Sequence, residues 1–254
     1  MPPSTIRTRT EGRTAWIALD RPPLNVLNID MMGELQAALE QTLPQSDFVV
    51  LQGAGPKGFS AGVEIADHAP ERVDEMLTSF HAIFRRLARA DCVTIAAVHG
   101  HCLGGGMELA TFCDFVIATR SAKFAQPEIK LACFPPIAMI TLSHLCGFRA
   151  AADLILTGRT ISAEDALNFG LLSRIAPDGE LHQSVHQLLV ELGGLSPKAL
   201  RLTRRSLWRL HADEFESQLR AIEQVYLHEL MPMEDAREGV RAFMEKRAAV
   251  WQAR

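Results

Sequence analysis

Two glutamates, Glu108 and Glu128, stand 20 positions apart, and the first closely follows a run of three glycines at positions 104 to 106. Carboxyl groups can accept and donate protons, and glycine-rich backbone can present N–H groups to an oxygen that becomes negatively charged. Together these residue types indicate an enzyme. A single glutamate is usually a solvated surface residue, but the apolar neighbours of Glu108 and the proline before Glu128 favour a functional role for both.

The segment 98–108 predicts the end of a strand, a tight glycine loop and the start of a helix. The first N–H groups of a helix have no partner within it, and the helix dipole there favours negative charge. An enolate-like oxygen would be stabilised at that position. The alternative is a turn that needs glycine only for its backbone conformation. The spacing does not match a dinucleotide-binding or phosphate-binding loop.

A second glycine turn, at 58–63, can supply another N–H donor. It also matches the pattern G-x-S-x-G, in which Ser60 would be the nucleophile of a serine thioesterase or hydrolase. That motif requires a strand leading directly into the serine and a helix directly after it. Residues 53–57 intervene before the turn and Pro70 limits any helix after it. The sequence therefore favours the donor role and keeps the Ser60 nucleophile as an alternative.

The elements that must position these residues follow an alternating pattern in the first half of the chain. Short apolar runs predict strands at 14–19, 48–51, 93–98 and 115–118. Between them, patterns with helical spacing predict helices at 31–43, 73–90 and 107–112. This alternation is typical of the α/β class.

The rest of the chain predicts helices, because strand patterns stop after about residue 134. Ser162 and Asp165 form a capping-box pattern, and further helices are expected at 196–210, 214–230 and 234–251. Ser196 and Pro197 give the clearest break between helices. We therefore expect a core domain over residues 1–195 and a C-terminal helical region over 196–254.

Composition restricts the class of protein. The 254 residues are 48% hydrophobic, carry a net charge of −4 and contain no long run of one charge, which argues against a nucleic-acid partner. The five cysteines form no C-x-x-C pair, and no secretory signal is visible, so we expect reduced thiols and a cytoplasmic protein. The longest apolar stretch, 131–142, contains two prolines and is too short to span a bilayer, so no membrane is expected.

The pair His99 and His101 is the best candidate for a metal site, but no acidic or thiolate residues recur at ligand spacing beside it. We expect no metal.

The residues above resemble the crotonase superfamily, the enoyl-CoA hydratase/isomerase family. The similarity runs in order through nearly the whole chain, over the segments 21–27, 59–62, 104–110, 124–128, 157–159 and 166–171. It implies a crotonase-like spiral of ββα units with a C-terminal helical region used in trimerisation, and a homohexamer built as a dimer of trimers. It also implies an acyl-CoA thioester as the substrate, with no cofactor beyond that coenzyme A.

By the same resemblance, the thioester oxygen would accept hydrogen bonds from the backbone N–H groups of Val63 and Gly105. Glu108 and Glu128 match the two glutamates of the family's hydratases. Retention of both favours addition of water to a conjugated enoyl-CoA, with an enoyl-CoA isomerase as the alternative within the family. Further substrate-binding and CoA-binding positions follow by correspondence: Ala61, Glu64, Ile65, Phe134, Pro136, Phe243 and Lys246.

Two departures from the family pattern bear on specificity. Glu64 stands where relatives often have aspartate, and the glycine-rich segment expected after the second glutamate is replaced by residues 131–139, with Pro135 and Pro136. This segment, the stretch 24–32 and the ending 243–251 are similar to the cyclic dienoyl-CoA hydratases of anaerobic aromatic degradation. A rigid proline wall should favour a flat ring over an extended chain, so cyclohexa-1,5-diene-1-carbonyl-CoA is an expected substrate.

Overall fold

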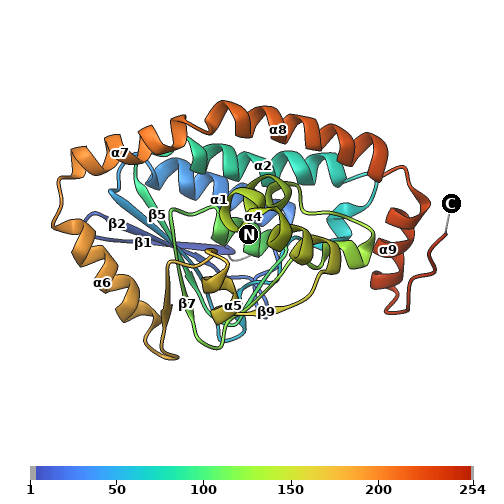
Figure 1. Cartoon of the computed structure of the whole chain (residues 1–254), viewed down its shortest axis with the longest axis horizontal. Helices are drawn as coiled ribbons and strands as arrows, with labels where there is room; N and C mark the ends of the chain where they lie inside the picture. Colours follow the sequence, from blue (N-terminus) through green and yellow to red (C-terminus); the bar gives the residue numbers. More distant parts are fainter. Residues whose placement is uncertain (1–3, 253–254) are drawn as a thin grey trace.

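The computed structural model describes residues 4–252, which form two β-sheets surrounded by helices (Figure 1). The larger sheet has the strand order β1-β2-β3-β5-β7-β10, in which the first pair is antiparallel and the others are parallel. Its strands are β1 (Ile6–Glu11), β2 (Thr14–Leu19), β3 (Phe48–Gly53), β5 (Val93–Val98), β7 (Phe115–Thr119) and β10 (Arg174–Ala176). Every residue of β5 is buried, as is usual for a parallel strand covered on both faces.

The smaller sheet is made of short strands in the order β4-β6-β8-β9. They are β4 (Gly58–Ser60), β6 (His101–Leu103), β8 (Lys123–Ala125) and β9 (Ile161–Ser162). The first three each follow a strand of the larger sheet, and each such pair leads into a helix: α2 (Val73–Ala88), α3 (Gly105–Thr111) or α4 (Pro136–Thr157). A short 3-10 turn precedes α2 and another precedes α4. This repeated ββα order confirms the expected crotonase-like spiral.

The helices α1 (Ile29–Thr42) and α2 pack as a pair over the core, next to the glycine loops at 58–63 and 104–106. Asn28 caps α1 by accepting a hydrogen bond from the backbone N–H of Met31 at 3.1 Å. Phe80 and Phe84 of α2 are buried and pack edge to face, with ring centroids 4.8 Å apart. This packing holds α2 in a fixed position, and the neighbouring glycine loops pack against it.

The C-terminal helices lie over this core. They are α5 (Ala163–Asn168), α6 (Leu181–Gly193), α7 (Pro197–Arg209), α8 (Ala212–Val225), a π-helical turn (Tyr226–Leu230) and α9 (Glu234–Met244). Helix α8 runs along α2, and α9 lies at the far end of the molecule beside the C-terminal segment (Figure 1). Arg204 of α7 is 4% exposed and anchors that helix by donating to Asp114 Oδ2 at 3.1 Å and to the carbonyl oxygen of Leu87 at 2.7 Å.

Two expectations for the second half of the chain were wrong. Strands do continue after residue 134, because β9 and β10 add to the two sheets at their edges. They have two and three residues, too few for an alternating pattern to be recognised. The last helix ends at Met244 rather than at residue 251, because Lys246 adopts a left-handed conformation with φ of 54° and turns the chain back along α9.

Within residues 4–252, α4 is the one helix with the length and apolar composition of a membrane span. Length and composition alone identify a span weakly, since core helices of soluble proteins share both. Gly147 also has non-helical dihedral angles, φ 77° and ψ 154°, and divides α4 into two shorter pieces. Each piece is shorter than the roughly 20 residues that a helical span needs.

Candidate active site

A cavity of about 420 Å³ lies where the glycine loops, the 3-10 turns and α9 meet. Its size and its mostly apolar lining suit a small-molecule ligand. Nine of the eleven site residues expected from the sequence line it: Ala61, Val63, Ile65, Gly105, Glu108, Glu128, Phe134, Pro136 and Phe243. The other two, Glu64 and Lys246, do not.

Glu108 reaches the cavity from α3 and is 2% exposed. Its Oε1 accepts a hydrogen bond of 2.8 Å from the backbone N–H of Ala138, in the first turn of α4. Burial raises the pKa of Glu108 to about 7, although backbone hydrogen bonds from Ala138 and Ile137 act in the opposite direction. Such a carboxyl group can exchange a proton near neutral pH, and the N-terminus of α4 holds it in place.

Glu128 reaches the cavity from the 3-10 turn η2 (Pro127–Leu131), which directly follows β8 and Gln126. The residue is partly exposed, but its Oε2 is buried and has no hydrogen-bond partner among residues 4–252. Burial, followed by the charge of Glu108, raises the pKa of Glu128 well above its usual range. The two carboxyl groups therefore share one electrostatic environment and resist ionising together.

The glycine run makes room for this arrangement. Gly104 has φ of 50°, and a Cβ atom there would lie 2.4 Å from Glu128 Oε1. A Cβ atom on Gly106 would lie 2.6 Å from the carbonyl oxygen of Ser60. Glycine at 104 therefore suits the left-handed turn and leaves room for Glu128, and glycine at 106 allows close approach to the backbone of Ser60.

The two expected N–H donors lie on adjacent segments. A Cβ atom on Gly62 would lie 3.3 Å from the backbone nitrogen of Gly105, and one on Gly105 would lie 2.8 Å from Val63 Cγ2. The neighbouring N–H groups of Gly62, Glu64 and Gly104 donate to Ser60, Leu27 and Ala125, respectively. In the described part of the chain, the N–H groups of Val63 and Gly105 make no such hydrogen bond, so both are free for a ligand oxygen.

Ser60 is fully buried and does not line the cavity. Its hydroxyl donates to the carbonyl oxygen of Asn25 at 2.7 Å and accepts from the N–H of Gly62 at 3.1 Å. Both hydrogen bonds fix the turn that presents Val63. This placement removes the geometry that a serine nucleophile needs, because a nucleophile must reach the ligand.

Glu64 and Lys246 lie outside the cavity lining for different reasons. Glu64 is turned toward Arg21, whose Nη1 donates to its Oε2 at 3.0 Å. Lys246 is exposed at the turn after α9. The neighbouring Arg247 lines the cavity instead.

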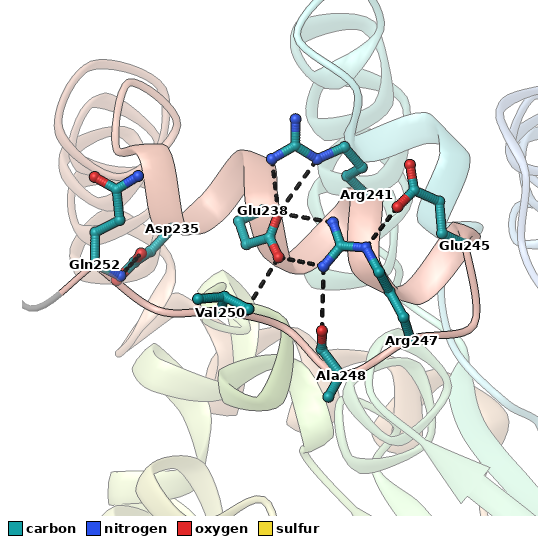
Figure 2. Close-up of polar contacts among 8 residues, drawn as sticks. All are labelled: Asp235, Glu238, Arg241, Glu245, Arg247, Ala248, Val250 and Gln252. Atoms are coloured by element: carbon teal, nitrogen blue, oxygen red, sulfur yellow. Dashed lines mark hydrogen bonds and ion pairs between the residues drawn. The ribbon is translucent and has the colours of Figure 1, made fainter.

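Arg247 belongs to a network that the sequence did not predict, which we call the C-terminal clasp: Glu238, Arg241, Arg247 and Val250 (Figure 2). Glu238 Oε2 accepts from Arg247 Nη2 at 2.9 Å, and its Oε1 accepts from the backbone N–H of Val250 at 3.0 Å. Arg247 and then Arg241 hold the pKa of Glu238 well below its usual range. The clasp fastens residues 247–250 along α9, so that Arg247 and Ala249 complete one wall of the cavity.

Several other lining residues had no predicted role, and Tyr226, Cys133 and Phe80 are among the most buried of them. Their types are common in cores, and the helical pattern around Tyr226 shows only that one face is apolar. Its one distinguishing signal is that it is the single tyrosine of the chain.

No group of three or more His, Cys, Asp or Glu side chains suited to a metal ion occurs within residues 4–252, and His99 instead contacts the carbonyl oxygen of Gly55 at 2.8 Å. The five cysteines carry free thiols, four of them buried and Cys146 partly exposed.

Comparison with known proteins gives a consistent result. A model of the enoyl-CoA hydratase/isomerase family matches residues 9–254. The chain is 33% identical to a cyclohexa-1,5-dienecarbonyl-CoA hydratase of Thauera aromatica, covering 99% of this chain and 98% of that protein. It is 37% identical to a probable enoyl-CoA hydratase of Mycobacterium bovis over 96% of each chain. A solved carnitinyl-CoA hydratase from Mycobacterium avium superposes with a TM-score of 0.85 at 31% identity, covering 99% of this chain and 100% of that one.

Proposed function

Since the chain belongs to the enoyl-CoA hydratase/isomerase family, we propose that it adds water to a conjugated enoyl-CoA thioester by a two-glutamate mechanism. The observation that carries this proposal is that Glu108 and Glu128 line one cavity together with the free N–H groups of Val63 and Gly105. The two carboxyl groups can make every proton transfer that hydration needs. The two amide N–H groups can stabilise the negative charge that develops on the thioester oxygen.

Glu108 takes a proton from water as the water oxygen forms a bond to the carbon of the conjugated double bond that lies β to the thioester carbonyl. The electron pair of the carbon–carbon double bond moves toward the thioester, whose oxygen becomes negatively charged and accepts from the two N–H groups. Glu128, kept protonated by burial and by its neighbour, then gives its proton to carbon. In a simple enoyl ester this is the carbon next to the thioester, and in the cyclic dienoyl ester it is the far end of the second double bond, so that addition there is 1,4 rather than 1,2. Transfer of a proton from Glu108 back to Glu128 restores the starting state. The proposed reaction uses no cofactor beyond the coenzyme A of the substrate.

We further propose that the acyl group is a flat, conjugated ring, with cyclohexa-1,5-diene-1-carbonyl-CoA as the best candidate. Phe134, Pro135 and Pro136 form one wall of the cavity, and Pro136 begins α4, whose N-terminus binds Glu108. Such a wall is rigid and cannot widen for a long chain without moving a carboxyl group. The name of the Thauera aromatica relative supports this choice.

A panel of CoA thioesters tests both levels of the proposal. The purified enzyme is assayed with cyclohexa-1,5-diene-1-carbonyl-CoA, crotonyl-CoA and a longer linear enoyl-CoA, and incorporation of ¹⁸O from labelled water is measured in each product. We expect kcat/KM for the cyclic ester to exceed that for crotonyl-CoA by roughly tenfold, the scale of a few pocket contacts.

Equal or better kinetics on linear esters would reject the ring assignment and leave a general enoyl-CoA hydratase. Migration of the double bond without ¹⁸O incorporation on every ester would reject hydration in favour of isomerisation.

A further inference from the structure

Tyr226, the single tyrosine of the chain, lines the cavity although it belongs to the C-terminal helices and lies 98 positions after Glu128. It is 1% exposed. The mechanism proposed above gives it no task. A phenol in a largely apolar cavity that also contains two carboxyl groups is a candidate for direct contact with the ligand.

The local backbone fixes where Tyr226 lies. It is the first residue of the π-helical turn that continues α8, and single π-turns inside helices often occur at functional sites. Three residues earlier, Glu223 accepts from Arg85 at 3.0 Å and pairs with His81 at 2.7 Å, which fastens α8 to α2. The anchor and the wider turn together set the position of the tyrosine.

The ring of Tyr226 is held on its cavity side as well. It packs edge to face against Phe134, with ring centroids 5.0 Å apart and planes at 80°. Phe134 belongs to the same segment that places the N-terminus of α4 against Glu108. The orientation of the phenol is therefore coupled to the part of the cavity where the carboxyl groups lie.

The hydroxyl of Tyr226 lies beside the thiol of Cys133, which is a weak hydrogen-bond partner. Buried tyrosine hydroxyls usually have a stronger partner than this. Burial, together with Cys133, Glu128 and Glu108, raises the pKa of Tyr226 well above its usual range. The phenol therefore stays protonated at neutral pH and can act as a donor, but not as a base.

We propose that the hydroxyl of Tyr226 donates a hydrogen bond to the oxygen that the reaction adds to the acyl group. It would orient the attacking water in the forward direction and hold the new hydroxyl group of the product. This inference rests on the proposed hydration. Besides the two glutamates, which transfer the protons, the tyrosine would be a third polar group that contacts the acyl side of the ligand. It would fix the position of the water oxygen.

The test compares wild type with Tyr226→Phe, which removes only the hydroxyl. We expect kcat for hydration to fall roughly tenfold while KM for the thioester changes less than threefold, because the lost contact is to the water and not to the CoA ester. We also expect the preference for the hydroxyacyl-CoA product over its deoxy counterpart, 3-hydroxybutyryl-CoA over butyryl-CoA for a linear chain, to fall roughly tenfold.

Trp208→Phe is the matched control. It removes a polar group from a partly buried aromatic residue on α7 that donates to Asp114 at 3.0 Å and does not line this cavity. Loss of this hydrogen bond should lower the unfolding temperature. It should not change the ratio between the affinity for the hydroxyacyl-CoA product and the affinity for the deoxy thioester.

The single tyrosine allows a second measurement that needs no substitution. Protein labelled with 3-fluorotyrosine gives one ¹⁹F resonance, which should shift on binding the hydroxyacyl-CoA product and shift far less with the deoxy thioester. Equal shifts with both ligands, or a Tyr226→Phe variant with wild-type kcat and product preference, would overturn the proposal. A wild-type enzyme that hydrates no ester would instead reject the proposed function itself.

Discussion

At the scale of single residues, Glu108 and Glu128 carry the same group in different surroundings. Glu108 is bound by the N-terminus of α4, whereas Oε2 of Glu128 has no partner among the described residues. The spacing of the glycines and glutamates predicted the two carboxyl groups and nearby N–H donors, and the family resemblance assigned the donors to Val63 and Gly105. The sequence could not predict the contact from Ala138 or the position of Tyr226, because these depend on how distant helices pack.

Glu108→Gln and Glu128→Gln should each reduce kcat by at least about a hundredfold, the usual range for loss of an acid or base. Glutamine keeps the shape of the side chain and the acceptor for Ala138, so thioester affinity should persist. Steady-state kinetics and calorimetric binding of a saturated acyl-CoA measure the two effects separately. Near-wild-type hydration by both variants would contradict the mechanism.

The raised pKa of Glu108 also predicts how stability depends on pH. Between its ordinary value of 4.5 and about 7, the folded protein holds a proton that the unfolded chain releases, so the free energy of unfolding falls as pH rises through this window. Glu108→Gln removes the effect. The variant should be more stable than wild type at pH 8 by up to about 3 kcal/mol, at about 1.4 kcal/mol per pH unit.

Thermal unfolding of both proteins at pH 4 and pH 8 measures this difference. The two unfolding temperatures should agree at pH 4, where both chains are neutral at this position. If Glu108→Gln is less stable than wild type at pH 8, burial of the Glu108 carboxylate is not what lowers the free energy of unfolding of the wild type at that pH.

At the scale of elements, the strands β2, β3, β5 and β7 and the helices α1 and α2 were predictable from periodicity, and the three-residue strands of the smaller sheet were not. The six-residue strand β1 was also missed, because only its first residue is buried and its sequence has no apolar alternation. The end of α9 was predicted too late because its helical pattern continues in the sequence beyond Met244. The clasp ends the helix by long-range hydrogen bonds from Arg247 and Val250 to Glu238. Nothing in local sequence spacing identifies these partners.

Glu238→Gln should loosen the clasp and raise KM for CoA thioesters roughly fivefold, because the charged hydrogen-bond acceptor that holds Arg247 and Val250 is lost. The change in kcat should be less than threefold, since both glutamates remain in place. The matched control is Glu234→Gln on the same helix, whose pair with Arg237 is exposed at 3.5 Å. An unchanged KM in Glu238→Gln would show that the clasp does not support the cavity.

At the scale of the whole molecule, several large apolar side chains are exposed on α4, on α7 and at the residue that follows α7. Phe148, Leu156, Leu207 and Leu210 are 79%, 69%, 60% and 76% exposed, respectively. Leu207 and Leu145 also line a second cavity of about 480 Å³ between these helices. The shared cavity brings apolar surface of α4 and α7 together, and exposed apolar patches often mark protein–protein interfaces.

We therefore expect a homo-oligomer in solution, with a hexamer as the proposed state. Light scattering coupled to size-exclusion chromatography measures its mass, and Phe148→Asp should shift it to smaller species by placing a charge in the interface. Thr10→Asp, on the exposed face of β1, is the control and should leave the mass unchanged. A wild-type monomer at micromolar concentration would contradict the expectation.

The clasp also affects the order in which the protein matures during synthesis. Lining residues of the cavity run from Ala61 to Ala249, and the wall fastened by Glu238 is made last. Domains generally begin to fold from the N-terminus while the ribosome is still adding residues. A nascent chain can thus bring Glu108 and Glu128 together long before it can retain a thioester, so ligand binding reports that residues through Ala249 have been added and not merely that the core has folded.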